Sequence, residues 1–586
     1  MTGQGGRLRA LRGPLAVTFG LAVLATGCSS GHVERHVSLG PAGTPSAAPS
    51  QIVASSAPDP RQASRPNVVE IVTDDMRSDD LRFMPNVRRL VADRGLSFRN
   101  SFSPNPLCAP ARSSLLTGED SHNTGVLSVK APYNFSAFHD TDGLGPAMNR
   151  AGYNTVFLGK YMNGYGTEDA ASTGRISFRY VPPGWTEWWG STERPRGSGI
   201  SAGGTYSYYH AILNHNGTVR DDHAGQYQSV LEGRIARRMV RKYHRSPKPF
   251  FLYLAPIAPH FGAPDERDDP TGVVWPNTGR PERFKTPARP ARVRGKFDGV
   301  VTRPPGLPLT GTDGPAEMRG LPRPMRWRPP LSPQEKAAVL AVTRQRAEAL
   351  SVLDDEVGDL VRTLRSTDEL ANTVIAFTSD NGYFLGEHRM RQGKIWTHEP
   401  SLRVPFLIAG PGIPHGVRND PISSPDVAAT VMDLAGARPR RPVDGVSVVP
   451  SFAGDRGWRR AVLVENRLDA RVLKRALPSA PASWPKGITA SGIRTARYTY
   501  VRYVDGDAEL YDLDRDPNQL SNVYGRPRYA TVQAQLARVW RQRRDCRGAS
   551  CRAPLPASLQ KDPKQLRAST AKQRREVEAR YGEPTL

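Results

Sequence analysis

The strongest constraint on the fold is the alternation of short apolar runs with helical patterns along the chain. Runs of strand length occupy residues 68–73, 155–159, 249–255, 374–378 and 404–408. Apolar side chains between Leu350 and Leu364 repeat at helical spacing just before the fourth run. Strands that alternate with helices indicate a mainly parallel β-sheet covered by helices on both faces. The expected fold class is therefore α/β.

The N-terminus has the order of an export signal. Arg7, Arg9 and Arg12 precede the apolar residues 14–26, a stretch too short to span a bilayer. Residues 24–28 resemble a bacterial lipoprotein box, in which Cys28 becomes the lipidated first residue of the mature protein. The alternative is an ordinary cleaved secretory signal. We therefore expect export, either to the outer face of the cell membrane through a lipid anchor or as a secreted protein.

Composition divides the rest of the chain. Five further segments are expected after the signal (1–28): a flexible linker rich in Ser, Ala and Pro (29–65), a main domain (66–439), a Pro- and Arg-rich insertion inside it (262–330), a smaller C-terminal α/β subdomain (440–545) and a basic tail (546–586). The insertion is too long for an ordinary connection, so we expect either a lid or a disordered loop. Arg326 and Arg328 flank Trp327 there and form a candidate cation and stacking surface for a lid.

The formal charge of +25 favours anionic partners. Zinc-finger spacing, basic heptads and aromatic RNA-binding signatures are all missing from the sequence, so nucleic acid is not expected as a partner. A solvated basic surface is preferred over a dedicated polyanion groove.

The four cysteines have different expected fates. Cys28 is the candidate for lipidation, whereas Cys546 and Cys551 are close enough in sequence to form a small disulfide loop. Cys108 is then left alone. A lone Cys is more often an inert buried residue than a nucleophile, so its sequence context decides its role.

Polar residues stand where the predicted strands end. They are Asp74, Asp75, Lys160, His260, Asp380 and Asn381. In an open parallel sheet those ends share one edge, where ligands bind. Carboxylate and carboxamide oxygens suit Ca²⁺ or Mg²⁺. Taken singly, the pairs Asp74-Asp75 and Asp380-Asn381 are more often caps of helices and turns, and a single lysine is more often a surface residue. The joint placement of the two pairs after predicted strands favours a metal site.

The decisive segment is residues 107–118, which read LCAPARSSLLTG. It resembles the signature of the sulfatase family, Cys-x-Pro-x-Arg followed by Thr-Gly, although Ala111 stands where Ser is usual. Residues 67–75, 379–394 and 509–517 are similar to other conserved segments of that family. Residues 159–161, 180–189 and 255–260 are similar to its N-acetylglucosamine-6-sulfatase branch.

This resemblance implies an alkaline-phosphatase-like fold and a sulfuric ester hydrolase. A formylglycine-generating enzyme would convert Cys108 to formylglycine, whose hydrate attacks sulfate. The implied Ca²⁺ ligands are Asp74, Asp75, Asp380, Asn381 and an oxygen of modified Cys108, with Mg²⁺ as the alternative ion. The substrate would be a sulfated carbohydrate or an aryl sulfate.

The resemblance also assigns roles to single residues. Arg112 would orient the hydrate, Lys160 and Lys394 would hold the sulfate oxygens, and His260 would assist the leaving alcohol. Met162 replaces a His that arylsulfatases often carry. We therefore name Asn163 and His388 as candidate substitutes, with His388 counted among the substrate-binding groups.

Two other functions compete with this interpretation. One is a phosphatase or phosphodiesterase of the same superfamily, which would use Ser or Thr and two metal ions. The other is a lipid-anchored protein that binds sulfated polymers without hydrolysing them. Cys108 in its motif argues against the first, and the combination of Cys108, both acidic loops and the two lysines argues against the second.

Overall fold

The computed structural model describes residues 65–270, 273–274, 281–282, 284–311, 313–326, 328–467 and 487–582. The expected signal, Cys28, nearly all of the linker, and Trp327 lie outside the described residues. A search of the described helices finds none that is both long enough and apolar enough to cross a membrane.

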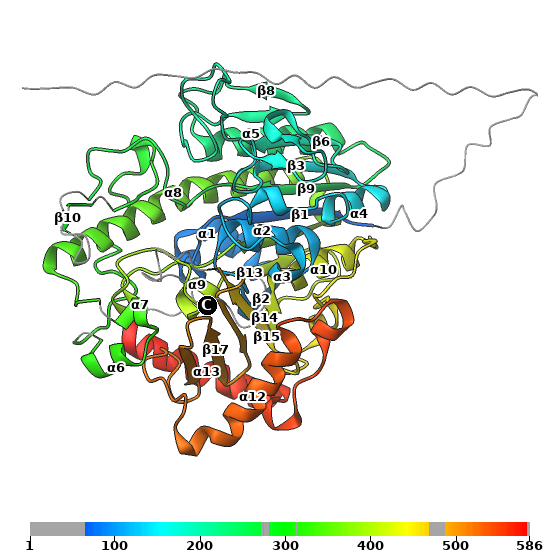
Figure 1. Cartoon of the computed structure of the whole chain (residues 1–586). Coiled ribbons are helices and arrows are strands. Elements are labelled where there is room, and N and C mark those ends of the chain that lie inside the picture. The colour runs from blue at the N-terminus through cyan, green and yellow to red at the C-terminus, as the bar shows by residue number, and fades with distance from the viewer. Residues whose placement is uncertain are drawn as a thin grey trace, which may run out of the picture. The chain divides into compact units, whose positions relative to one another are not determined.

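The core of the protein is a ten-stranded sheet in the order β14-β2-β13-β12-β1-β9-β3-β6-β7-β8 (Figure 1). Its centre contains four parallel strands, each overlapping a run expected from sequence: β12 (Thr373–Ser379), β1 (Asn67–Thr73), β9 (Phe250–Ala255) and β3 (Asn154–Lys160). The fifth run forms β13 (Phe406–Ala409), which pairs antiparallel with β12. The mainly parallel α/β fold is therefore confirmed.

The outer strands were not predicted. They are β2 (Leu96–Phe102), β6 (Glu187–Ser191), β7 (Leu213–His215), β8 (Thr218–Arg220) and β14 (Gly416–Ser423). They are short or carry polar residues, and β14 contains Pro421 at a register shift. Such sequences lack a strong strand pattern.

Helices cover both faces of the sheet. Successive strand residues point to opposite sides, so each face presents its own apolar side chains to the helices that cover it. Val69 and Ile71 of β1 pack with α1 (Pro85–Leu90), α5 (Gln228–Tyr243) and α8 (Pro333–Ser366). Val68 and Val72 pack with α2 (Cys108–Thr117), α4 (Leu144–Arg150) and α10 (Ser424–Leu434). The sheet is therefore the middle layer of three.

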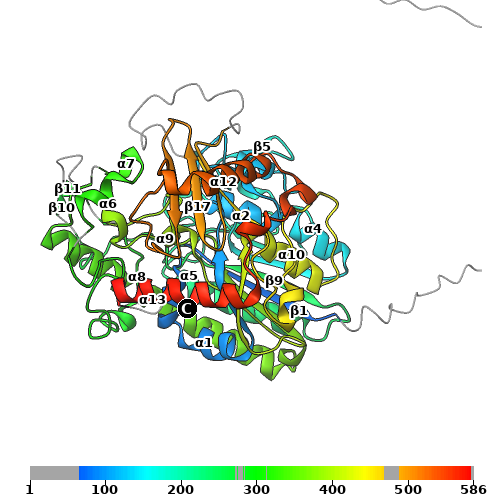
Figure 2. The same cartoon turned by 90° about the horizontal axis from the view of Figure 1, so that it is seen from below.

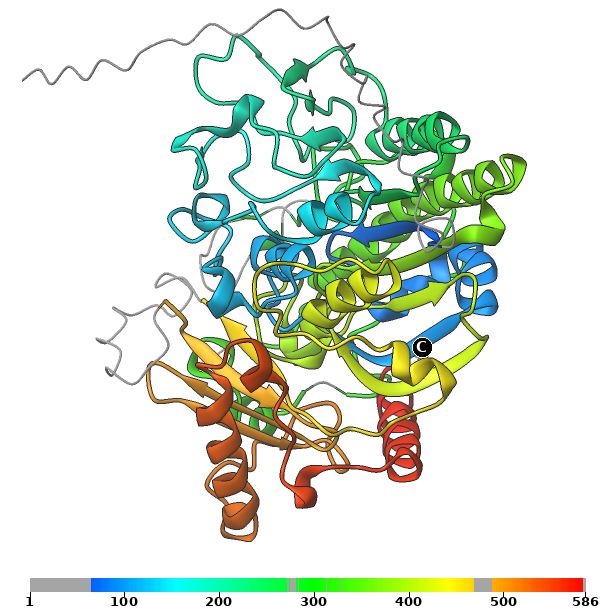
Figure 3. The same ribbon diagram turned by 90° about the vertical axis from the view of Figure 1, so that its right-hand side faces the viewer.

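A smaller subdomain follows the large sheet, as expected. Four antiparallel strands pair in chain order: β15 (Val462–Asn466), β16 (Ala490–Arg494), β17 (Tyr498–Tyr503) and β18 (Ala508–Asp512). The helix α12 (Ala530–Arg543) packs on this sheet through Leu536 and Trp540 (Figure 3).

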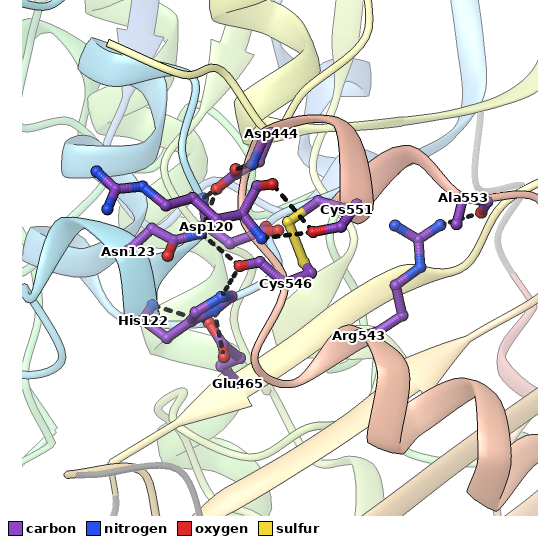
Figure 4. The surroundings of a disulfide bond; sticks show 12 residues. Asp120, His122, Asn123, Asp444, Glu465, Arg543, Cys546, Cys551 and Ala553 are labelled. Atoms are coloured by element: carbon purple, nitrogen blue, oxygen red, sulfur yellow. Dashed lines mark hydrogen bonds and ion pairs between the residues drawn. A yellow bond between two sulfur atoms is a disulfide. The ribbon is translucent and has the colours of Figure 1, made fainter.

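The chain beyond residue 545 is folded to residue 582 and does not form the expected tail. Cys546 and Cys551 form a disulfide with an S–S distance of 2.05 Å. Asn123 donates hydrogen bonds to the Cys546 carbonyl and to Asp444, both at 2.8 Å, so this loop is tied to the main domain (Figure 4). The last helix, α13 (Pro563–Tyr581), packs against β14 (Figure 2).

The described part of the insertion is packed, so the expected alternative of a disordered loop does not apply to it. Arg289 is 1% exposed and forms ion pairs with Glu266, Asp268 and Glu348, the last of which lies on α8. The pairs with Glu266 and Glu348 are buried, and buried ion pairs fix the path of a chain because breaking one leaves an uncompensated charge.

Glu70 is an unusual residue for the central strand. It lies on β1, is fully buried, and neither carboxylate oxygen has a hydrogen-bond partner. Burial raises the pKa of Glu70 to about 8. The folded state therefore holds this proton up to higher pH than the unfolded state does.

We predict that Glu70→Gln stabilises the protein at alkaline pH. A carboxyl whose folded pKa is raised contributes full stability below its unfolded pKa and loses it as pH rises towards about 8. Gln keeps the neutral form at every pH, so the free energy of unfolding should exceed that of the wild type by on the order of 4 kcal/mol at pH 8 and match it near pH 4.5. Denaturant unfolding at the two pH values measures this; an equal difference at both would contradict it.

Candidate active site

The site begins where β1 ends, and backbone hydrogen bonds hold its segments together. The Asp380 N–H donates to the Thr73 carbonyl at 3.0 Å, and the Asp74 N–H donates to Ala258 at 3.3 Å. Asp75 has φ 65°, a left-handed conformation that is rare for a residue other than Gly. The ends of β1, β12 and β9 are thus fixed relative to one another.

Cys108 is the first residue of α2 and is 2% exposed. Its Sγ donates to Asp74 Oδ1 at 3.3 Å and accepts from Lys394 Nζ at 2.7 Å. Burial, followed by the Asp74 carboxylate, raises the pKa of the Cys108 thiol to about 12, against the opposing effect of Lys160 and Lys394. The unmodified side chain is therefore a neutral thiol.

Arg112 lies one helical turn after Cys108 and so points from the same face of α2. Its Nε donates to Asp380 Oδ2 at 2.8 Å, and its Nη1 donates to the Lys160 carbonyl at 2.9 Å. Lys160 Nζ pairs with Asp74 Oδ2. Burial alone would raise the pKa of Asp74, but Lys160, His260 and Arg112 hold it well below its ordinary value.

His260 follows β9 and is 5% exposed. Its Nδ1 lies 2.6 Å from the Phe261 carbonyl, which can only accept, so the proton is assigned to Nδ1. Nε2 lies 3.7 Å from Asp75 Oδ2. Burial lowers the pKa of His260 to about 4 despite the nearby carboxylates.

Lys394 and Asn381 complete the cluster. Lys394 Nζ pairs with Asp75 Oδ1, and Asn381 Nδ2 donates to the same oxygen at 2.6 Å. Burial would lower the pKa of Lys394, but Asp75 and other acidic neighbours raise it well above its ordinary value. Both residues come from the loop after β12.

His388 does not join this cluster. Its ring lies 4.9 Å from that of His398 and packs against Phe384, whereas Asp74 and Lys394 are the residues that hydrogen-bond to Cys108. Left-handed backbone at His388, with φ 51°, turns the chain between Asn381 and Lys394, so sequence proximity to them was misleading. The role of His388 as a substrate-binding group is therefore not supported by its position.

Asn163 reaches the site through a residue that the sequence did not single out. Its Nδ2 donates to the Tyr206 hydroxyl at 2.7 Å. The Tyr206 ring lies 4.8 Å from Lys160 Nζ and 4.6 Å from the His260 ring. Tyr206 comes from a loop without periodicity, and no spacing in the sequence connects it to Lys160 or His260.

The donor atoms fit a hard divalent cation. One ligand atom from each of Asp74, Asp75, Cys108 and His260 lies within 4.8 Å of the others. Asp75 Oδ2 is buried and has no hydrogen-bond partner. Asp380 and Asn381 adjoin these atoms and add further oxygens of the kind that Ca²⁺ and Mg²⁺ bind.

Comparison with known proteins identifies the family. Residues 66–437 match the family model described as Sulfatase. The chain belongs to the sulfatase family. It is therefore a sulfuric ester hydrolase, as the segment around Cys108 predicted. Residues 484–545 match a second model, described as the C-terminal part of N-sulphoglucosamine sulphohydrolase.

Individual sulfatases align with most of the chain. An arylsulfatase from Volvox carteri is 27% identical, with 84% of this chain and 76% of that protein covered. The human N-acetylglucosamine-6-sulfatase is also 27% identical, with coverages of 84% and 86%. A solved structure described as a complex with its substrate D-glucosamine-2-N,6-O-disulfate shares the fold at a TM-score of 0.57 and 20% identity, covering 81% of this sulfatase and 97% of that chain.

We predict that the ring of Tyr206 positions Lys160 and His260. Tyr206→Ala removes the ring and should lower kcat/KM for an aryl sulfate by about tenfold or more, because a desolvated cation–π contact contributes ~1–2 kcal/mol. Tyr206→Phe keeps the ring and should retain most of the activity. Tyr209→Ala, on the same loop, is the control for general damage. Equal losses in the Phe and Ala variants would contradict a role for the ring.

Proposed function

We propose that this sulfatase hydrolyses sulfate monoesters with a formylglycine made from Cys108 and one bound divalent cation, preferentially Ca²⁺. The observation that carries the proposal is the convergence of Cys108 with three carboxylates and three basic side chains in one buried cluster: Asp74, Asp75, Asp380, Arg112, Lys160 and Lys394. A formylglycine hydrate would supply the attacking oxygen, and its second hydroxyl would allow sulfate to leave again.

The basic residues have distinct proposed tasks. Lys160 and Lys394 point their ammonium groups to the acidic centre from two sides and would hold the sulfate oxygens as charge builds on them. Arg112 is anchored by Asp380 and would orient the group at position 108. His260 directs its unprotonated Nε2 into the site, where it would take a proton from the attacking hydrate hydroxyl and then pass that proton to the leaving alcohol.

Asp74, Asp75, Asp380, Asn381 and an oxygen at position 108 are the proposed cation ligands. The unpartnered Oδ2 of Asp75 and the oxygen-rich donor set support this assignment. A bound cation would stabilise negative charge on the sulfate group. Mg²⁺ fits the same donor types and is the alternative ion.

For the substrate we propose a sulfated sugar, of the kind named for the human N-acetylglucosamine-6-sulfatase. The basic surface of the chain favours an anionic carbohydrate. We also propose export through the N-terminal signal, with lipidation at Cys28 holding the enzyme at the membrane surface. A formylglycine-generating enzyme is the required maturation partner.

We predict that Cys108 carries the modification and that activity depends on it. After alkylation of denatured protein from its native host, the Cys108 peptide should lack the thiol sulfur and remain unalkylated, as mass spectrometry can measure. Cys108→Ala should lower sulfate release by a factor on the order of 10³ or more while the melting temperature is kept.

Cys108→Ser should be nearly inactive wherever the maturation system accepts only Cys. An unmodified Cys108 in an active enzyme would sink the proposed chemistry. An unmodified Cys108 in an inactive protein that still binds sulfated polymers would favour the binding protein instead.

We predict that Ca²⁺ stabilises the fold through this site. At about 100 times its Kd, Ca²⁺ should add on the order of 2–3 kcal/mol to the free energy of unfolding, because it binds the folded state alone. EGTA should lower both the melting temperature and the activity. Asp75→Asn should abolish the thermal response to Ca²⁺, whereas the exposed Asp93→Asn should keep it. A chelated enzyme with an unchanged melting temperature would count against the metal site.

A further inference from the structure

A second site lies between α13 and the loops that carry the catalytic residues. A cavity of about 90 Å³ is lined there by residues from α13, from η7 (Glu387–Arg389), from α9 (Glu399–Leu402) and from the segment that follows Asp75. The volume corresponds to roughly three water molecules. It is large enough for one tetrahedral oxyanion.

Four buried polar atoms around this cavity have no hydrogen-bond partner. They are Arg574 Nε, Gln519 Nε2, His388 Nδ1 and Asn518 Oδ1. Gln519 and His388 are each only 1% exposed. Buried polar atoms normally have partners, so this concentration of unpaired atoms points to a polar ligand in the cavity.

Most of the charges that line the cavity are paired with one another. Arg77 pairs with Asp79 at 2.8 Å and with Glu387 at 2.7 Å. Arg494 pairs with Glu399 at 3.1 Å. The basic groups of these pairs are therefore compensated within the cavity wall.

Arg574 is not compensated in this way. Burial and the nearby guanidinium groups of Arg99 and Arg403 lower the pKa of Arg574 to about 10, against the opposing effect of Glu578. An anion beside Arg574 would relieve this unfavourable environment. The Arg574 guanidinium is thus a partly buried cation near two other cations.

The backbone holds Gln519 in place at this cavity. Gln519 has φ 55°, a conformation that is costly for a residue other than Gly. Its Oε1 accepts from the Glu399 N–H at 2.8 Å, which fixes the amide and leaves Nε2 as a free donor. Nε2 is thus a preoriented hydrogen-bond donor in the cavity wall.

We propose that this cavity binds a small inorganic oxyanion, such as phosphate or sulfate, through Arg574 and Gln519. The anion would connect α13 to the two loops that bracket the catalytic residues, because Arg77 and Asp79 follow Asp75 and because η7 and α9 flank Lys394. The site is separate from the cluster around Cys108 and does not depend on the modification of that residue.

The test is selenate binding to the full protein. Calorimetry should give a Kd for selenate that rises at least about tenfold in Arg574→Gln, because the variant loses a hydrogen bond from a charged group to the anion. Arg575→Gln is the matched control, since Arg575 is the exposed neighbour on α13 and does not line the cavity. Val577→Phe should block the cavity and also abolish this binding event.

Crystals soaked in selenate should show an anomalous selenium peak within hydrogen-bond distance of Arg574 Nε and Gln519 Nε2. A peak at the Cys108 centre alone, or equal Kd values for the Arg574 and Arg575 variants, would overturn the proposal. Separate titrations with phosphate and sulfate then identify which of the two anions the cavity prefers, and so where the bound anion comes from. A preference for sulfate points to the reaction product and a preference for phosphate to the surrounding medium, and both support the site.

Discussion

The structure depends on the mutual compensation of charges that are buried together at one edge of the sheet. Asp74, Asp75 and Asp380 are all completely buried, as carboxylates almost never are without partners. Arg112, Lys160 and Lys394 supply the opposite charges from α2, β3 and the loop after β12. Removing one of the six would leave a buried charge uncompensated. The positions of four chain segments therefore depend on one another. The geometry of the candidate active site and the stability of the core have the same origin.

The C-terminal part of the chain supports this arrangement from outside the large sheet. His398 adjoins the loop of Lys394 and hydrogen-bonds to Glu509 on β18 at 3.1 Å. Asn100 on β2 donates to Thr570 on α13 at 3.1 Å, and the disulfide loop is tied to Asn123. A segment that composition alone suggested to be a basic tail therefore holds the edge of the sheet, because Leu566 and Tyr581 provide buried apolar contacts among the surrounding basic residues.

Local sequence patterns were sufficient to predict the parts of the fold that are buried on both sides. The runs at β1, β3, β9, β12 and β13 are apolar on both faces because helices cover the sheet, and that pattern does not depend on distant partners. Strands β7 and β8 form through pairing with neighbouring strands at the edge of the sheet, and their short sequences carry no strand pattern of their own. The site residues likewise divide into those that follow predicted strands and those that loops position. Asp74, Lys160, His260 and Asp380 follow predicted strands, whereas Tyr206 is brought in by a loop and His388 is turned away by left-handed backbone.

The difference between residues after predicted strands and residues in loops explains why the sequence predicts the reaction better than the substrate. The side chains proposed to contact the sulfate group are at most 12% exposed, so the rest of a substrate must approach from the less buried side of the cluster. Tyr206 and Phe261 are partly exposed and contact the His260 ring, and the partly exposed Asn163 hydrogen-bonds to Tyr206. None of these three residues lies in a regular helix or strand. Loops tolerate substitution because they carry few of the contacts that hold the core. The residues proposed to act on the sulfate group thus lie at strand ends, at one helix terminus and in the loop after β12, all held by buried ion pairs. The residues placed to contact the rest of a substrate lie in loops that can change without disturbing those pairs.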